Sequence, residues 1–407
     1  MKPAAQTMHD NEAMQSAQPG QLSPRGRRVR RTRQRSRAVR AAWSVIPTAS
    51  VSIVVLGDFT LGDTVSAIDS SPAVPRDSTP DSAAPDPALH SEAEFQRNFT
   101  SIVANVERVI RGKTDVVRLL VLALVCDGHV LIEDVPGVGK TSLGKALARS
   151  VEGRFGRVQF TPDLLPTDVT GMSVWNRASE TFEFRPGPIF SDVLLADEIN
   201  RASPKTQSAL LEAMAERQVT SDGATHELGS PFMVIATQNP IEHEGTYTLP
   251  EAQLDRFLMQ LAIGYPDREA ENLILESQEG PHDSADQITA VVSAETVRGM
   301  SKSLDQIYIA APLRQYLLYW AGATRGHPSL LLGLSPRGVL ALQRVARARA
   351  ASLGRRYSIP DDVKELARVV LPHRLLVTPE MRMRGVRTSD VVTEILDSVP
   401  VPRPERR

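Results

Sequence analysis

A short glycine-containing loop between two regular elements constrains this fold more than any other feature of the chain. The loop, DVPGVGKT at residues 134–141, follows an apolar, β-branched run at 129–133 and precedes a helical pattern that begins at Ser142. A strand, such a loop and a helix, in that order, form the context in which backbone N–H groups and a helix N-terminus bind phosphate. Asp134 occupies the position of the usual first glycine, so an ordinary strand-to-helix turn is the alternative interpretation.

The phosphate-binding interpretation gives each residue of the loop a role. Gly137 and Gly139 allow the backbone to turn its N–H groups toward phosphate, while Lys140 would pair with the terminal phosphates. The hydroxyl of Thr141 would bind Mg²⁺. The predicted nucleotide-contacting residues of the loop are Pro136, Gly137, Val138, Gly139, Lys140, Thr141 and Ser142.

Two carboxylates end a second apolar run, VLLADE at residues 193–198. Ligands of α/β sheets bind at the carboxyl ends of strands, where Asp197 can hold Mg²⁺ and Glu198 can polarise the water that attacks the γ-phosphate. The alternative is that this acidic pair caps the helix predicted at 203–216. Because both motifs occur in the required order, we predict a site for ATP and Mg²⁺, with Thr141 and Asp197 as metal ligands.

Three more residues are candidates for catalysis. Asn239 follows a strand predicted at 232–237, where its amide could orient the attacking water. Arg256, in LDRF at 254–257, has no carboxylate at helical spacing, although a surface salt bridge to another element is possible. Arg337 lies in the first turn of a predicted helix, where a solvated surface residue is the alternative.

The composition changes twice along the chain. Residues 1–90 are rich in Ser, Pro, Ala, Asp and Arg, which predicts a disordered N-terminal extension. Strand and helix patterns alternate over 91–278, which predicts an α/β domain with a parallel sheet sandwiched by helices. Only helical patterns follow Pro266, so we predict a small all-helical domain at 279–407 without further strands.

Charge, apolar runs and cysteine content restrict the function classes. The formal net charge of −1 conceals an arginine block at 25–40, which could contact nucleic acid or anionic lipid but is more typical of a solvated tail. The apolar run at 43–57 is interrupted by polar residues and is too short for a membrane span, although it mimics part of a secretory signal. The single cysteine, Cys126, cannot form an internal disulfide, which favours a cytoplasmic location.

Taken together, these motifs resemble the MoxR family of AAA+ ATPases. The similar segments extend from about Phe99 to Pro402 and include GHVLIEDVPGVGKT, FRPGPIFSDVLLADEINRASPKTQSALLEAMAERQVT, ATQNPIEHEGTYTLPEAQLDRF and LGLSPRGVLALQRVARARA. An aspartate at the position of Asp134 is common in this family. Two positions depart from its pattern: His243 replaces a usual glutamine, and Gly112–Lys113 replaces a usual Gly-Gln pair near the adenine pocket.

The resemblance implies an AAA+ P-loop NTPase fold with a helical lid, assembled as a homo-hexamer. It also implies inserted hairpins at 172–184, facing the ring pore, and at 218–228. By this resemblance, Lys140 and Thr141 belong to the phosphate loop, Asp197 binds Mg²⁺ and Glu198 is the general base. Asn239 is the first sensor. Arg256 is an arginine finger toward the neighbouring subunit, and Arg337 is a second sensor within the same chain.

The function that the resemblance implies is ATP-driven, chaperone-like remodelling of partner proteins, often von Willebrand factor A-type domain proteins. One alternative is the ATPase motor subunit of a metal chelatase. Another is a DNA-associated ATPase that uses the arginine block, but the part beyond residue 90 is acidic on balance, so nucleic acid is not the expected partner.

Overall fold

The computed structural model describes residues 90–239, 246–277 and 288–401. The predictions for the N-terminal extension, the arginine block, the apolar run at 43–57 and His243 lie outside the described residues. Within these ranges, no helix is both long and apolar enough to cross a membrane.

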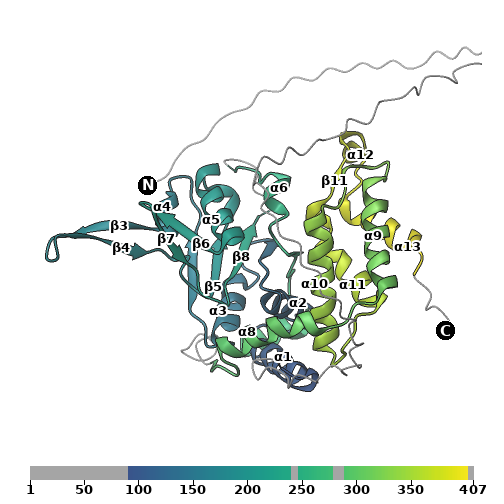
Figure 1. The fold of residues 1–407 in the computed structure, drawn as a ribbon, viewed down its shortest axis with the longest axis horizontal. Coiled ribbons are helices and arrows are strands. Elements are labelled where there is room, and N and C mark those ends of the chain that lie inside the picture. The colour runs from purple at the N-terminus through teal and green to yellow at the C-terminus, as the bar shows by residue number, and fades with distance from the viewer. Residues whose placement is uncertain (1–89, 240–245, 278–287, 402–407) are drawn as a thin grey trace, which may run out of the picture. The chain divides into compact units, whose positions relative to one another are not determined.

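A five-stranded parallel sheet, which includes β5 and β8, forms the centre of the α/β part (Figure 1). The order of its strands is β2-β5-β8-β1-β9. All four strand pairings are parallel. The predicted α/β fold class with a parallel sheet is therefore confirmed. The strands are β1 (Val130–Glu133), β2 (Phe155–Gln159), β5 (Val193–Asp197), β8 (Met233–Gln238) and β9 (Met259–Leu261).

Alternate residues of the central strands enter two separate apolar cores, as the period of two in a strand requires. Val130 and Ile132 pack into the core formed with α1, α2 and α3, whereas Leu131 packs into the core formed with α5 on the opposite face. This two-sided burial explains why the strands read as nearly continuous apolar runs. The helices are α1 (Glu92–Glu107), α2 (Thr114–Val125), α3 (Lys140–Ser150) and α5 (Pro204–Glu216).

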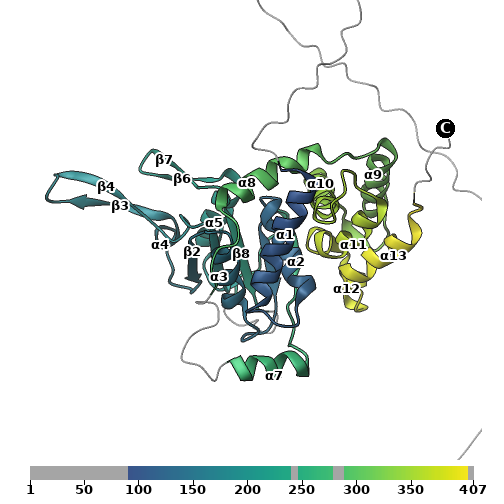
Figure 2. The same cartoon turned by 90° about the horizontal axis from the view of Figure 1, so that it is seen from below.

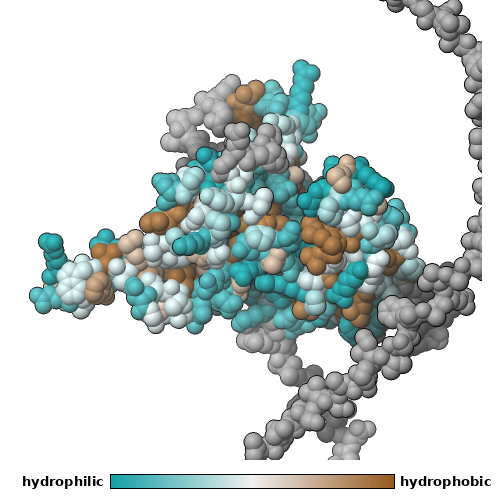
Figure 3. Space-filling model, turned by 90° about the horizontal axis from the view of Figure 1, so that it is seen from above, coloured by the Kyte–Doolittle hydropathy of each residue, from teal (hydrophilic) through white to brown (hydrophobic). Residues whose placement is uncertain are grey.

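Two hairpins extend from this sheet, at the positions that the sequence predicts. Figure 3 shows β3–β4 as a projection that carries apolar residues among polar ones, and both Trp175 and Phe182 are exposed there. In β6–β7, Asp222 and Gly223 both have positive φ angles, as a tight two-residue hairpin turn requires. The bounds are α4 (Pro166–Thr170), β3 (Gly171–Asn176), β4 (Thr181–Pro186), β6 (Gln218–Ser221) and β7 (Ala224–Glu227).

The C-terminal part is mainly helical, but the prediction that it contains no strand is wrong. Two short strands, β10 (Leu330–Leu332) and β11 (Leu376–Val377), pair antiparallel. They are too short to show an alternating pattern in the sequence. Two further helices precede this part: α6 (Glu251–Leu254), between β8 and β9, and α7 (Arg268–Ser277). The helices of the C-terminal part are α8 (Ala294–Ser303), α9 (Ala311–Arg325), α10 (Pro336–Ser352), α11 (Pro360–Val370), α12 (Pro379–Met383) and α13 (Thr388–Ser398).

The helical part shares an apolar core with α1 and α2. Figure 2 shows α1 and α2 between α3 and the helices α10 and α11. Phe95 of α1, Leu120 of α2 and Leu342 of α10 belong to the same buried cluster. Burial of this apolar surface stabilises the contact between the α/β part and the helical part.

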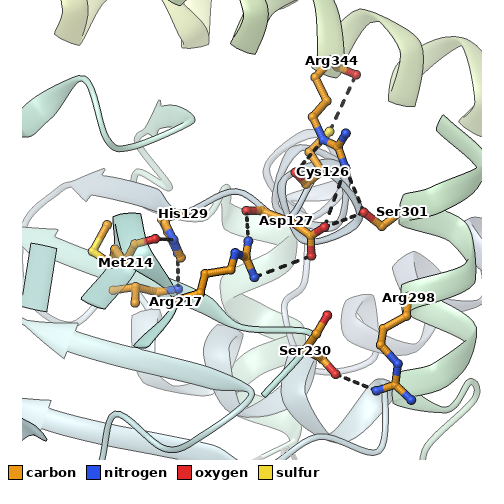
Figure 4. A network of polar contacts seen from close by, with 10 residues as sticks. Cys126, Asp127, His129, Met214, Arg217, Ser230, Arg298, Ser301 and Arg344 are labelled. Carbon is orange, nitrogen blue, oxygen red and sulfur yellow. Dashed lines mark hydrogen bonds and ion pairs between the residues drawn. The ribbon is translucent and has the colours of Figure 1, made fainter. Parts of the chain in front are cut away.

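A polar network around Asp127 joins four helices (Figure 4). Arg217, at the end of α5, donates to the Asp127 carbonyl oxygen at 2.7 Å, and the Ser301 hydroxyl of α8 donates to Asp127 Oδ2 at 2.6 Å. Arg344 of α10 donates to the carbonyl oxygen of Cys126 at 2.9 Å, with a guanidinium nitrogen 3.7 Å from Asp127 Oδ2. The network therefore fixes α10 against the end of α2.

Candidate functional site

The predicted phosphate loop connects β1 to α3, and two of its glycines have backbone conformations that L-residues rarely adopt. The φ angles of Gly137 and Gly139 are +86° and +91°, and Gly139 is the N-cap of α3. This geometry brings backbone N–H groups and the positive end of the helix dipole to one place, which suits an anion. Lys140 Nζ donates to the Asp134 carbonyl oxygen at 2.7 Å.

A cavity of about 450 Å³ opens beside this loop, within the range of about 300–1,000 Å³ that is typical of ligand sites. It brings together most of the predicted site. Val138, Arg256 and Arg337 are not among its lining residues. The lining residues are Pro136, Gly137, Gly139, Lys140, Thr141, Ser142, Arg157, Gln159, Asp197, Glu198 and Asn239.

Thr237, on β8, holds the turn at the end of β5 that carries both carboxylates. Its hydroxyl donates to Asp197 Oδ1 at 2.7 Å and accepts the Glu198 backbone N–H at 2.8 Å. Glu198 has a positive φ of +57°, an uncommon conformation for glutamate. The threonine therefore fixes the turn that directs the two carboxylates toward the cavity.

Three further side chains form hydrogen bonds or ion pairs with these carboxylates. Arg157, on β2, contacts Asp197 Oδ2 at 2.9 Å. Glu198 Oε2 accepts hydrogen bonds from Gln159 Nε2 at 2.8 Å and Arg201 at 2.9 Å. Arg157 and Arg201 therefore place positive charge beside the two carboxylates, and Gln159 adds a neutral hydrogen bond to Glu198.

Lys140 is partly buried in this acidic environment. Burial lowers the pKa of Lys140, while the nearby carboxylates of Asp134, Asp197 and Glu198 act in the opposite direction. These carboxylates favour the cationic form of the lysine, which is the form that pairs with phosphate.

The donor set fits a magnesium ion bound together with phosphate. Thr141 and Asp197 line the same cavity, so a hydroxyl and a carboxylate are both present there as candidate Mg²⁺ ligands. Mg²⁺ is usually held by one or two carboxylates, water and substrate phosphates rather than by a protein cage. Among the described residues, no cluster of three or more His, Cys, Asp or Glu could form such a cage.

Sequence reasoning missed Arg157, Gln159 and Thr237. Arg157 and Gln159 are two residues apart on β2, so their side chains share a face beside the end of β5. Two polar residues with this spacing near the end of a strand were the available signal. No comparable signal identified Thr237, because its role depends on the neighbouring strand β5.

Asp134 is a structural part of the loop rather than a simple replacement for glycine. It is buried, and its Oδ2 accepts the backbone N–H groups of Ile263 and Gly264 at 2.7 and 2.6 Å. Its Oδ1 accepts the N–H of Val135 at 2.8 Å. The carboxylate thus joins the phosphate loop to the segment between β9 and α7.

The two predicted arginines lie outside the lining of this cavity. Arg256 follows α6, and Arg337 is in the first turn of α10. The Ser335 hydroxyl, at the N-cap of α10, donates to Asp255 Oδ2 at 2.9 Å, so the two arginine-bearing segments are neighbours. Neither guanidinium forms an ion pair with a residue in the described ranges.

Comparisons with known proteins agree with this geometry. A family described as "ATPase family associated with various cellular activities (AAA)" matches residues 129–259, and an "AAA lid domain" matches residues 322–395. The Bacillus subtilis protein YeaC, described as uncharacterized, is 49% identical over 74% of this chain and 93% of its own length. Chaperone MoxR1 of Mycobacterium tuberculosis is 40% identical over 74% of this chain and 81% of its own length.

Two further relatives extend the comparison. Protein MoxR of Paracoccus denitrificans is 32% identical over 76% of this chain and 98% of its own length. A solved structure from Cytophaga hutchinsonii, assigned as an ATPase, has a TM-score of 0.73 and 36% identity, and it covers 77% of this chain and 97% of that chain.

Proposed function

The chain belongs to the MoxR family of AAA+ ATPases, and on that premise we propose that it is a Mg²⁺-dependent ATP hydrolase whose turnover remodels partner proteins. The observation that carries the proposal is the Thr237 hydroxyl, which holds Asp197 and Glu198 beside the phosphate loop. This arrangement supplies the three functions that phosphoryl transfer needs: a phosphate cradle, a metal ligand and a base.

In this proposal, the loop N–H groups and Lys140 bind the β- and γ-phosphates, with Thr141 and Asp197 as Mg²⁺ ligands. The metal, when bound, neutralises charge on the phosphate oxygens. Glu198 accepts a proton from the attacking water, and Asn239 orients that water. Gln159 and Arg201 both hydrogen-bond to Glu198 Oε2, so the other oxygen, Oε1, would accept the proton.

We propose that Arg256 acts as a finger on the nucleotide of a neighbouring subunit in a homo-hexamer. Its absence from the lining of its own cavity supports a role between subunits. Arg337 is a second sensor within the same chain according to the resemblance. Its proximity to the Arg256 segment instead supports a role beside Arg256 at the neighbouring nucleotide.

The client is proposed to be a folded partner protein, with von Willebrand factor A-type domain proteins as the first class to test. The name of the Mycobacterium tuberculosis relative as a chaperone supports remodelling. We also propose domains at 91–278 and 279–407, a division that the matches to an AAA domain and an AAA lid support. We further propose a cytoplasmic location.

Mixed variants test the shared site. Lys140→Ala should lose ATP binding, and Arg256→Ala should bind ATP but hydrolyse it poorly. Mixing the two should restore part of the activity, because the intact pocket of Arg256→Ala then receives the intact Arg256 of a Lys140→Ala subunit. Normal ATP affinity in Lys140→Ala would show that the loop is misassigned, and a lack of recovery in every mixture would contradict a finger shared between subunits.

A trapped state tests the client. Full-length Glu198→Gln, which we expect to bind ATP without rapid turnover, is immobilised with ATP and exposed to candidate von Willebrand factor A-type domain proteins. ATP-dependent retention supports remodelling of that class, with Lys140→Ala as the matched control that cannot bind ATP. Equal retention by both variants would contradict an ATP-driven interaction.

A further inference from the structure

The residues on both sides of Arg256 are held by side chains of the helical part. Asp255 Oδ1 accepts a hydrogen bond from Arg374 Nε at 2.8 Å. After Arg256, the Phe257 carbonyl oxygen accepts hydrogen bonds from Arg374 Nη2 at 2.6 Å and from His373 Nε2 at 2.9 Å. The backbone at Arg256 is therefore fixed on both sides, while its guanidinium pairs with no carboxylate of the described chain.

Arg374 is buried to an extent that is rare for arginine, with a side chain only 2% exposed. Its remaining donors reach the carbonyl oxygens of Leu258, at 2.9 Å, and Val370. Burial lowers the pKa of Arg374, and the Asp255 carboxylate acts in the opposite direction. A buried charge whose three nitrogen atoms all donate hydrogen bonds holds its surroundings in one arrangement, because a displacement would break these bonds.

The same aspartate also holds the segment of Arg337. Asp255 Oδ2 accepts the Ser335 hydroxyl hydrogen at 2.9 Å, and the Ser335 oxygen accepts the Gly338 N–H at 3.0 Å. Arg337 lies between these two residues in the first turn of α10. Farther along α10, Arg344 donates to the Cys126 carbonyl oxygen, so the helix is held at a second point (Figure 4).

We infer that Asp255, held by Arg374 and Ser335, is a positioning residue that directs Arg256 and Arg337 together toward the nucleotide of a neighbouring subunit. The inference rests on the proposed finger role of Arg256. An arginine that acts across an interface loses its effect when its backbone shifts by about 1 Å, a displacement that can cost about 100-fold in rate. Asp255 suppresses such shifts by joining both segments to one buried ion pair.

The test uses Asp255→Ala, with Asp255→Asn as the conservative partner that keeps an oxygen to accept the Arg374 hydrogen bond. Asp255→Ala should bind a fluorescent ATP analogue within about two-fold of the wild type but hydrolyse ATP about 10- to 100-fold more slowly. Asp255→Asn should recover a large part of that loss. Wild-type turnover by Asp255→Ala would overturn the inference, as would loss of nucleotide binding in both variants, because Asp255 would then serve folding alone.

Mixing experiments separate a positioning role from general damage. Asp255→Ala mixed with Lys140→Ala should recover activity, because Lys140→Ala supplies an intact Arg256. Asp255→Ala mixed with Arg256→Ala should not recover activity, because both subunits offer defective fingers. Recovery in the second mixture, or none in the first, would overturn the inference.

The mixture of Arg256→Ala and Lys140→Ala is the reference for the shared finger itself. If this mixture does not recover activity, the proposed shared finger is wrong and the inference fails with it. If it recovers activity while Asp255→Ala hydrolyses ATP like the wild type, only the inference about Asp255 fails.

Discussion

Thr237 shows how one hydroxyl group can organise the chemistry of this site. It donates to Asp197 and accepts from the backbone of Glu198, so it fixes the proposed metal ligand relative to the proposed base. Its buried position on β8 leaves no room for the side chain to leave this arrangement. Replacement of this residue should therefore affect the chemical step more than the binding of the nucleotide.

Thr237→Val removes the hydroxyl and keeps the shape of the side chain. We expect kcat for ATP hydrolysis to fall by about 10- to 100-fold, with ATP-analogue affinity within about three-fold of the wild type. Steady-state kinetics and fluorescence titration measure the two quantities. Thr237→Ser keeps the hydroxyl, so its kcat should remain close to that of the wild type. Equal kcat values for Thr237→Val and Thr237→Ser would contradict the role of the hydrogen bonds.

Two buried histidines should make stability depend on pH. Burial lowers the pKa of His129 to about 4 and that of His373 to about 3. Met214 and Val234 bond to the two ring nitrogens of His129, so the neutral ring is the form that fits. The unfolded chain takes up protons below its ordinary histidine pKa of about 6.5, whereas the folded chain does not, so stability falls as the pH drops from about 6.5 toward these folded values.

Urea unfolding at pH 7 and pH 5 measures this effect. By pH 5, each histidine should lower the unfolding free energy by on the order of 2 kcal/mol. Ordinary carboxylates titrate mainly below this pH. His373→Gln should remove about half of the pH dependence. An unfolding free energy that stays constant between pH 7 and pH 5 would contradict the burial of neutral histidines.

At the scale of elements, Asp134 joins two parts of the fold. Its carboxylate connects the phosphate loop, which follows β1, to the backbone between β9 and α7. Lys113, at the start of α2, donates to the Tyr265 carbonyl oxygen in the same segment at 2.7 Å. The loop is therefore braced by the chain that leads toward the helical part, a function that glycine at position 134 could not provide.

Asp134→Gly gives the loop its more usual first residue and removes the brace. We expect unfolding free energy to fall by about 2–4 kcal/mol, because two buried N–H groups lose their acceptor, and ATP affinity to weaken. Denaturant unfolding and nucleotide titration measure these changes. Asp134→Asn retains one oxygen and should have an intermediate effect. If Asp134→Gly matches the wild type in both measurements, the Asp134 carboxylate does not stabilise the loop.

The sequence predicted those elements whose signal is local. β1, β5 and β8 are buried on both faces and read as apolar runs, and the loop before α3 has a recognisable glycine pattern. β2 (Phe155–Gln159) is harder to locate from the sequence, because its partly exposed residues give a weak apolar signal and its limits follow pairing with β5. Contacts such as Arg374 with Asp255 join residues far apart in the chain, so no local pattern reveals them.

At the scale of the whole molecule, the helical part is fixed to the α/β part by a shared apolar core and by polar connections. These connections include the Asp127 network and the Arg374–Asp255 pair. The phosphate cavity and the segment of Arg256 and Arg337 are separate features of the same chain. This separation favours an account in which each chain binds one nucleotide and acts on another.

The central claim is that this chain hydrolyses ATP with Glu198 as the base. The most direct measurement compares steady-state ATP hydrolysis by the wild type and Glu198→Gln, with binding of an ATP analogue measured on both proteins. We predict wild-type turnover, similar binding by both, and hydrolysis by Glu198→Gln that is slower by about 100-fold or more. Equal hydrolysis by the two proteins, or no hydrolysis by the wild type, would contradict this account.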